Sequence, residues 1–209
     1  SDQRVITIED SAELQIKGIS NLVRLEVRNG DADGENAVTI RDLIRSALRM
    51  RPDRIIVGEI RGAEAVDMLS AMNTGHNGSL STGHGNSAAD MLSRMETMVL
   101  MGSGIPLAAI RQQIASSLDI VIHLGRLRDK TRKVLEISEI QGYENGEILL
   151  NPLYRFEETP VVREKGTYGS LARNGSRGRI KADTSRVIGR LNPTGNKLCH
   201  VQKLYAAGL

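Results

Sequence analysis

The chain has 209 residues, 40% of them hydrophobic, and carries a formal net charge of +3. This length allows one substantial core with an appendage, and the longest uncharged stretch, 97–110, is broken by glycines and a proline and is too short to span a bilayer. No secretory signal is visible, and the single cysteine, Cys199, excludes an intrachain disulfide, which is typical of a cytoplasmic protein.

The first part of the chain predicts an α/β fold. RVITI (4–8) and LVRLEV (22–27) have the pattern of strands, and the second alternates apolar with charged residues as a half-exposed strand does. From Thr39 onward, apolar residues recur at helical spacing until Pro52 stops the helix. RIIV (54–57) is apolar on both sides, which is typical of a strand in the middle of a parallel sheet covered by helices.

The middle of the chain continues this alternation. Residues 63–72 predict a helix, and GSLST (78–82) predicts a short strand. Ser87 is the expected N-cap of the next helix, Pro106 opens another, and DIVIHL (119–124) is again strand-like. A parallel sheet with helices between its strands is therefore the expected architecture.

Two sets of helical residues have structural interpretations that we favour over functional ones. All seven methionines lie between Met50 and Met101, where helical spacing favours core filling over a binding groove. An arginine row on the first helix is expected to be a solvated face, although one member could reach the nucleotide of a neighbouring subunit. The row consists of Arg41, Arg45, Arg49 and Arg51.

The last third of the chain has a different pattern. RKVLEISEI (132–140) and EILLNPLYRF (147–156) predict two antiparallel strands joined by an Asn-Gly turn (145–146), at the edge of the sheet or as a small subdomain. Residues 160–209 carry 10 Lys and Arg against 2 Asp and Glu, whereas residues 1–159 carry 18 against 23. We predict an α/β domain followed by a partly ordered, Gly/Arg-rich basic extension, which either meets an anionic partner or is simply solvated.

Three polar clusters follow predicted strands, where an α/β fold places its chemistry. They are TIEDSAEL (7–14), GEIRG (58–62) and STGHGNS (81–87). Because the carboxyl ends of parallel strands meet at one edge of a sheet, we expect the clusters to converge. The side chains brought together would be Glu9, Asp10, Glu13, Glu59, Arg61 and His84.

This combination suits phosphoryl transfer. A carboxylate at a strand end can hold Mg²⁺ through water or orient an attacking water, and Arg61 can supply charge to phosphate oxygens. His84, in a turn bracketed by glycines, could contact a γ-phosphate. Each feature has a simpler interpretation: a helix cap for TIED, a surface ion pair for Glu59 and Arg61, and a turn histidine for His84. Their occurrence together favours a functional site.

Other chemistries are disfavoured. His76 and His84 are too far apart for a metal pair on one helical turn and Cys199 is remote, so a zinc site is not expected. No GxSxG nucleophile elbow is present. His123 alternates within an apolar strand and is most simply a packed or edge histidine.

The order and the residues of the three clusters resemble the motifs of the type II/type IV secretion ATPase superfamily. ITIEDSAEL resembles its Asp box, LRMRPDRIIVGEIRG its atypical Walker B segment, and NTGHNGSLSTGHGNSAADMLSRME its His box. The stretch that follows, METMVLMGSGIPLAAIRQQIASSLDIVIHLGRLRDKTRKVLEISEI, looks most like the CpaF/TadA branch, the motors of Flp-type pili. The resemblance covers roughly residues 4–158.

The resemblance implies a RecA-like P-loop NTPase core within a cytoplasmic homohexamer at the inner face of the cell membrane. Such a motor hydrolyses ATP with Mg²⁺ and drives an inner-membrane platform protein that assembles or retracts pilus subunits. Glu59 would be the general base and would reach Mg²⁺ through water. Glu13 and Glu9 would be Asp-box carboxylates acting near Mg²⁺ and water.

Two further roles follow from the same resemblance. His84 would contact the nucleotide and link its state to conformation. Arg61 would be a structural or phosphate-facing arginine, and Gly58 would face the nucleotide. The family more often has alanine where this sequence has Gly85, a change expected to add flexibility beside His84 without abolishing its role.

A phosphate-binding loop of the form GxxxxGK[ST] appears nowhere in the sequence. The chain therefore resembles the C-terminal part of such a motor, and we expect 1–159 to be an incomplete ATPase domain, with 160–209 as its basic extension. Without the loop's N–H groups and lysine, tight ATP binding and turnover are not expected. Two alternatives stay open: a nucleic-acid translocase or binding module, disfavoured by scarce aromatics and an acidic body, and a non-catalytic oligomerisation scaffold.

Overall fold

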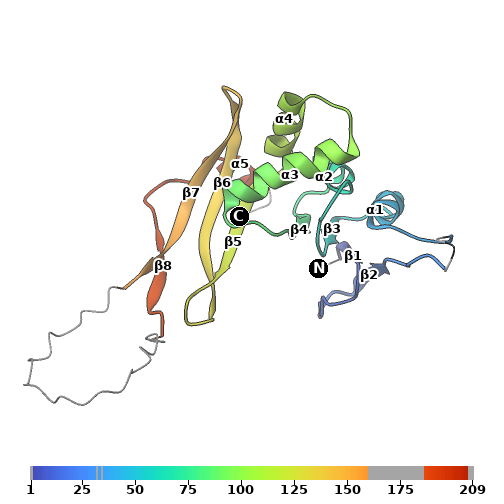
Figure 1. Ribbon diagram of the computed structural model, residues 1–209, viewed down its shortest axis with the longest axis horizontal. Helices are drawn as coiled ribbons and strands as arrows, with labels where there is room; N and C mark the ends of the chain where they lie inside the picture. Colours follow the sequence, from blue (N-terminus) through green and yellow to red (C-terminus); the bar gives the residue numbers. More distant parts are fainter. Residues whose placement is uncertain (1, 32, 34, 160–185, 207–209) are drawn as a thin grey trace, which may run out of the picture.

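The computed structural model describes residues 2–31, 33, 35–159 and 186–206 (Figure 1). It contains a parallel sheet of order β2-β1-β3-β4 and an antiparallel sheet of order β5-β6-β7-β8. The strands of the parallel sheet are β1 (Arg4–Glu9), β2 (Asn21–Glu26), β3 (Arg54–Val57) and β4 (Leu80–Ser81). The strands of the antiparallel sheet are β5 (Ile120–Arg126), β6 (Arg132–Glu144), β7 (Glu147–Glu158) and β8 (Gly189–Pro193).

The parallel sheet has its most apolar strands at its centre. β1 lies between β2 and β3, and Ile6 and Ile8 on β1 are fully buried together with Ile55 and Val57 on β3. Strands buried in this way belong inside a parallel sheet covered by helices. The prediction of an α/β fold is confirmed.

Four helices join the two sheets around one core. They are α1 (Ile40–Arg49), α2 (Ala65–Asn73), α3 (Ala88–Gly102) and α4 (Leu107–Ser117). α1 packs against β1, α2 contacts both α3 and α4, and α4 contacts β6 and β7. The core is therefore continuous from Ile6 through Leu69 and Ile110 to Ile140 on β6.

The starts of two helices follow from their sequences. Thr39 accepts a hydrogen bond from the backbone of Asp42, whose side chain bonds back to Thr39, forming a capping box for α1. Ser87 caps α3 by accepting from the backbone N–H of Asp90. None of the helices in the described ranges has the length and apolarity needed to cross a membrane.

The methionines and arginines of the helices serve mainly packing and helix pairing. Met68, Met95 and Met98 are buried in the core, which agrees with core filling, whereas Met101 is 69% exposed. Arg45, Arg49 and Arg51 are exposed, as expected of a solvated face, but Arg41 and Arg45 also pair with Asp67 of α2, at 2.6 and 3.0 Å. These two arginines therefore tie α1 to α2.

The antiparallel sheet contains the predicted hairpin and one strand that was not predicted. β6 and β7 turn at Asn145 and Gly146, both with positive φ, as an Asn-Gly hairpin turn requires. β8 pairs with β7, and the short helix α5 (Val201–Ala206) follows it. Residues 160–185, where a partly ordered extension is predicted, lie outside the described residues.

Each sheet ends in a strand with apolar side chains facing outward. β4 is the last strand of the parallel sheet and β5 the first of the antiparallel sheet. Leu80 on β4 is 60% exposed, and Ile122 and Leu124 on β5 are 53% and 62% exposed. Such edges can accept a further strand.

Candidate functional site

The three polar clusters lie at one edge of the parallel sheet because β1, β3 and β4 are adjacent and run in the same direction. The backbone N–H of Gly58 donates to Ile8 at 2.8 Å, and that of Ile60 donates to Thr82 at 3.0 Å. The Thr82 hydroxyl also donates to the carbonyl of Gly58. The loops after the three strands are thus bonded to one another, as the sequence predicts.

Glu59 is held between two basic side chains. Arg61 donates to its Oε2 through Nε at 2.8 Å and lies 2.6 Å away through Nη2. The Nε2 atom of His84 lies 2.9 Å from Oε1. The Arg61 hydrogen bond lowers the pKa of Glu59 against the opposing effect of burial, with smaller contributions from the charges of Arg61, His84 and Arg94.

The exposure of these side chains differs greatly. The Glu59 side chain is 21% exposed, whereas those of Arg61 and His84 are 68% and 78% exposed. Oε1 of Glu59 is buried and accepts no hydrogen bond of good geometry from the described residues. The carboxylate is therefore fixed by the fold, while both of its partners have room to move toward a ligand.

The sequence analysis missed one residue that shapes this site. Oε1 of Glu64 accepts hydrogen bonds from the backbone N–H of Arg61 at 2.6 Å and of Gly62 at 2.9 Å. Glu64 thereby fixes the turn from which the Arg61 side chain extends. A carboxylate just before a helix and directly after a glycine turn was the available signal, because such positions satisfy free N–H groups.

At this edge of the sheet the Glu9 side chain is buried, whereas those of Asp10 and Glu13 are exposed to solvent. Glu9 is 4% exposed, and its Oε1 accepts from the backbone N–H groups of Glu13 and Leu14, each at 2.9 Å. Asp10 and Glu13 are exposed, and their charges, after the larger contribution of Glu59, help to raise the pKa of Arg61. In this arrangement Glu9 holds the loop and the other two contribute negative charge near Arg61.

Gly58 is required for the close approach of two strands. A Cβ atom at this position would lie 3.1 Å from Cγ of Glu9, closer than nine in ten real Cβ contacts, so Glu9 would have to shift by a few tenths of an ångström. Glycine therefore brings the buried carboxylate of Glu9 next to the turn that carries Glu59.

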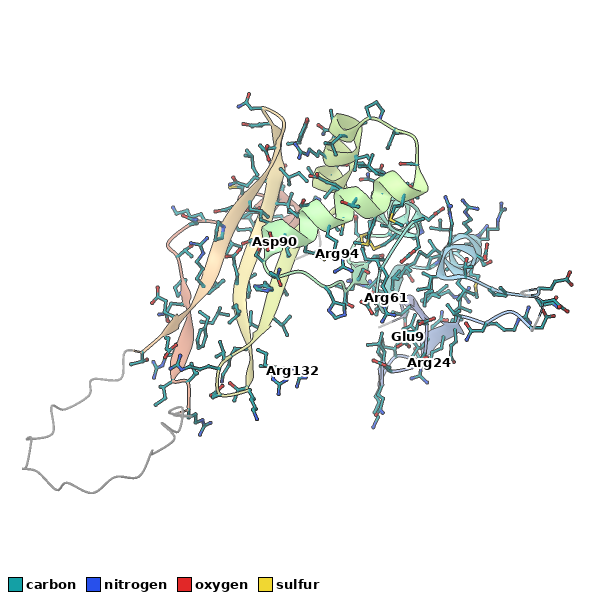
Figure 2. The ribbon with its side chains drawn as sticks, in the orientation of Figure 1. Glu9, Arg24, Arg61, Asp90, Arg94 and Arg132 are labelled. Atoms are coloured by element: carbon teal, nitrogen blue, oxygen red, sulfur yellow. The ribbon has the colours of Figure 1, made fainter. Side chains whose placement is uncertain are left out.

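A polar hollow of about 410 Å³ adjoins His84. It is lined by His84, Gly85, Asn86, Asp90 and Arg94, and Figure 2 shows Asp90 and Arg94 along α3. Nη1 of Arg94 donates to the carbonyl of His84 at 3.3 Å. A Cβ atom at Gly85 would lie 2.9 Å from that of Met91, so the glycine permits tight packing of the His84 loop on α3 as well as flexibility.

Other candidate side chains lie elsewhere or serve the fold. The ring of His76 bonds the carbonyl of Ala71 at the end of α2, at 3.0 Å. His123 is half-buried on β5, which is an edge strand. Within the described ranges no group of three or more His, Cys, Asp or Glu residues could hold a metal ion.

Comparison with known proteins places these observations in a family. The family model described as "Type II/IV secretion system protein" matches residues 1–188. A Mycobacterium tuberculosis protein assigned provisionally to conjugal transfer is 43% identical over 68% of this chain and 40% of its own length. The conjugal transfer protein TrbB of Rhizobium radiobacter is 34% identical over 77% of this chain and 46% of its own.

The fold has the same relatives. The crystal structure of the VirB11 ATPase from the Brucella suis type IV secretion system, in complex with sulphate, superposes with a TM-score of 0.58 and 36% identity. That match covers 66% of this chain and 40% of VirB11. The chain thus spans less than half the length of the relatives it matches.

Proposed function

This chain belongs to the type II/IV secretion system protein family, and we propose that the complete protein is an ATP-hydrolysing motor subunit of Flp-type pilus assembly. The observation that carries the proposal is the Glu59 carboxylate held between Arg61 and His84 at the carboxyl edge of a parallel sheet. A RecA-like core of this kind binds nucleotide at that edge. The VirB11 relative is itself described as an ATPase.

In this proposal Glu59 orients and deprotonates the attacking water. A general base must lie within hydrogen-bond reach of the water and be ionised when the water binds. Arg61 meets the second condition, because it lowers the pKa of Glu59. It also limits the basicity of Glu59 for as long as the pair persists.

Arg61 would exchange partners when nucleotide binds. Its guanidinium is largely exposed and can turn toward phosphate oxygens, which bind arginine in the same two-pronged manner as a carboxylate. Loss of the pair would raise the pKa of Glu59 and make it a stronger base. Ligand binding and activation of the base would then be one event.

The other side chains would support this exchange. His84 lies 2.9 Å from Oε1 of Glu59, so a movement or change of charge of this carboxylate would shift His84 and, with it, the loop that packs on α3. Glu9 would position the Asp-box loop, and Glu13 would place its charge near the nucleotide's cation. Gly58, by letting Glu9 pack against the turn, would keep the backbone next to Glu59 in place beside the nucleotide.

The side chains around Glu59 do not suit a metal ion that the protein would bind directly. The Glu59 carboxylate faces a guanidinium and an imidazole, and the described residues form no cage of three ligands. Mg²⁺ in nucleotide sites commonly keeps several waters and is held by phosphates and one or two carboxylates. Any Mg²⁺ would therefore arrive with ATP and reach Glu59 and Glu13 through water.

The phosphate-binding loop would come from a segment outside these 209 residues. The relatives are more than twice as long as the matched region, and the open edges of β4 and β5 leave room for a further strand. The residues that would receive such a strand include Leu80 and Ile122, both exposed. The isolated chain would bind ATP weakly and not hydrolyse it.

The partners proposed for the complete protein are further copies of itself, as a homohexamer, and an inner-membrane platform protein. The motor would work at the cytoplasmic face of the membrane. A nucleic-acid translocase is the second candidate, since two relatives are named for conjugal transfer. Saturable, salt-sensitive binding of single-stranded DNA by the complete protein would support that candidate, and its absence at low salt would remove it.

Calorimetric titration with ATP tests the proposal by comparing this chain with the complete protein. We expect tight binding and turnover by the complete protein only. Micromolar ATP binding by the isolated chain would contradict the proposed source of the phosphate loop. Absence of turnover in the complete protein would favour the scaffold alternative.

A further inference from the structure

The end of the antiparallel sheet at the turn between β5 and β6 carries a group of unpaired cations. This end extends beyond the helices, and Arg132 lies there, away from α3 (Figures 1 and 2). We call these side chains, all exposed, the basic hairpin: Arg126, Lys130, Arg132, Lys133 and Arg186. Within the described part of the chain, none of the five side chains makes a hydrogen bond or a contact ion pair. Their charge is therefore available to a partner.

The local pairing compensates only part of this charge. Arg126 and Arg132 lie directly opposite each other across β5 and β6, and like charges in this position destabilise a strand pair. The one carboxylate of the turn, Asp129, accepts from the N–H and hydroxyl of Thr131 and from the N–H of Val187. These bonds, with the nearby charge of Lys133, lower the pKa of Asp129 to about 2, so Asp129 is ionised and its single negative charge offsets only part of the positive charge of the five cations.

The turn also holds a lysine in a conformation that favours glycine. Lys130 has φ of 67°, in the left-handed region that non-glycine residues adopt at a cost of about 1 kcal/mol. Glycine or asparagine would relieve this strain, whereas lysine adds a charge at the tip. Positive charge is thus present at this end of the sheet at two positions where it costs stability: Lys130, with its unfavourable φ, and the opposed pair Arg126 and Arg132.

Exposed aliphatic side chains adjoin the cations. Leu124 precedes Arg126 by two residues on β5, so both side chains lie on the same face of the strand, and Leu124 is 62% exposed. Ile188 is 61% exposed and lies beside the turn, because the neighbouring Val187 bonds Asp129. Cations combined with exposed aliphatic groups suit an interface that is both anionic and apolar.

We propose that the basic hairpin docks on an anionic phospholipid surface. Its cations would bind headgroup phosphates, while Ile188 would enter the boundary with the acyl chains. Single-stranded nucleic acid fits less well, because it is bound through aromatic stacking and the turn residues 126–133 include no aromatic. This surface lies outside the Glu59 site and does not depend on the proposed ATPase activity.

Vesicle co-sedimentation of the 209-residue chain tests this proposal. The vesicles contain equal parts of phosphatidylglycerol and phosphatidylcholine, or phosphatidylcholine alone. The test variant is Arg126→Gln/Arg132→Gln, which removes the opposed pair. The matched control is Lys17→Gln/Arg49→Gln, which removes two exposed charges elsewhere. Because each basic residue near an anionic surface contributes about fivefold in binding, we expect about thirtyfold weaker binding by the test variant.

A second variant separates lipid from nucleic acid. Ile188→Asn removes an exposed apolar group and should weaken vesicle binding while leaving any binding of single-stranded DNA, measured by fluorescence anisotropy, unchanged. The proposal is overturned by equal binding to both kinds of vesicle or to neither, by equal losses in the test and control pairs, or by a vesicle affinity that Ile188→Asn does not change. Binding of DNA in preference to anionic vesicles would also overturn it.

Discussion

Arg61 binds one oxygen of the Glu59 carboxylate through two nitrogen atoms, Nε at 2.8 Å and Nη2 at 2.6 Å. The two residues are separated by a single residue in the sequence, but only the glutamate is fixed by the sheet. Because the arginine is mostly exposed, the pair can open without moving the carboxylate.

Replacing Arg61 by glutamine should raise the pKa of Glu59. The guanidinium stabilises the ionised carboxylate, and burial opposes ionisation, so removing the guanidinium leaves the effect of burial less opposed. The pKa is measured from the Glu59 side-chain ¹³C shift as a function of pH in this chain. Arg49→Gln, on the exposed face of α1, is the control and should leave the titration unchanged. An identical Glu59 titration in wild type and Arg61→Gln would refute the role given to the pair.

Replacing Glu64 by alanine should loosen the turn after Glu59. The amides of Arg61 and Gly62 would lose their acceptor and exchange with solvent about tenfold faster, as expected for loss of a charge-assisted hydrogen bond. Glu64→Gln keeps an acceptor oxygen and should restore much of the protection. Glu35→Ala, in the exposed loop before α1, is the control. Unchanged exchange at both amides would show that Glu64 does not fix the turn.

Glu139 should make the stability of the fold depend on acid pH. This carboxylate is 1% exposed. Burial raises its pKa, but hydrogen bonds from the backbone of Cys199 and His200 and from the side chains of Asn151 and His200 outweigh burial and lower the pKa to about 2.

The sign of this dependence follows from the folded pKa lying below the unfolded value. The contribution of Glu139 is fully present above the unfolded pKa, near 4.5, and is lost as the pH falls toward 2. Its size at neutral pH is on the order of 3 kcal/mol. Urea unfolding at neutral and acid pH measures it. Glu139→Gln should be destabilised at neutral pH and lose most of the acid dependence, whereas Glu144→Gln, which is exposed, should retain it.

The capping box of α1 should contribute measurably to stability. Thr39→Ala removes the side chain that accepts from Asp42 and should lower the free energy of unfolding by about 1 kcal/mol. Ser46→Ala, at an exposed position within the same helix, should change it by less than about 0.5 kcal/mol. Equal effects of the two substitutions would show that the cap is not stabilising.

The sequence predicts the parallel half of the fold well because its signals are local. RIIV is apolar on both sides and becomes the inner strand β3, and Ser87 caps the helix that it precedes. The convergence of the three polar clusters follows from the same parallel order. Each of these predictions depends on a few neighbouring residues.

Long-range pairing is what the sequence does not reveal. β8 pairs with β7 although residues 159–188 separate the two strands in the chain, and its sequence, GRLNP, has no apolar alternation. Asp67 lies more than 20 residues from Arg41 and Arg45, so their ion pairs cannot be inferred from helical spacing. Glu64 was missed for a different reason, since a carboxylate that bonds only backbone has no distinctive partner in the sequence.

The steady-state ATPase rate of the complete protein carrying Glu59→Gln tests the central claim most directly. The amide keeps the size of the side chain but cannot accept the proton of water, so kcat should fall by about 10²- to 10⁴-fold with little change in ATP affinity. Glu144→Gln removes the same charge from an exposed position on β6 and should retain the wild-type rate. A Glu59→Gln protein with a wild-type kcat would contradict the assignment of Glu59 as the base.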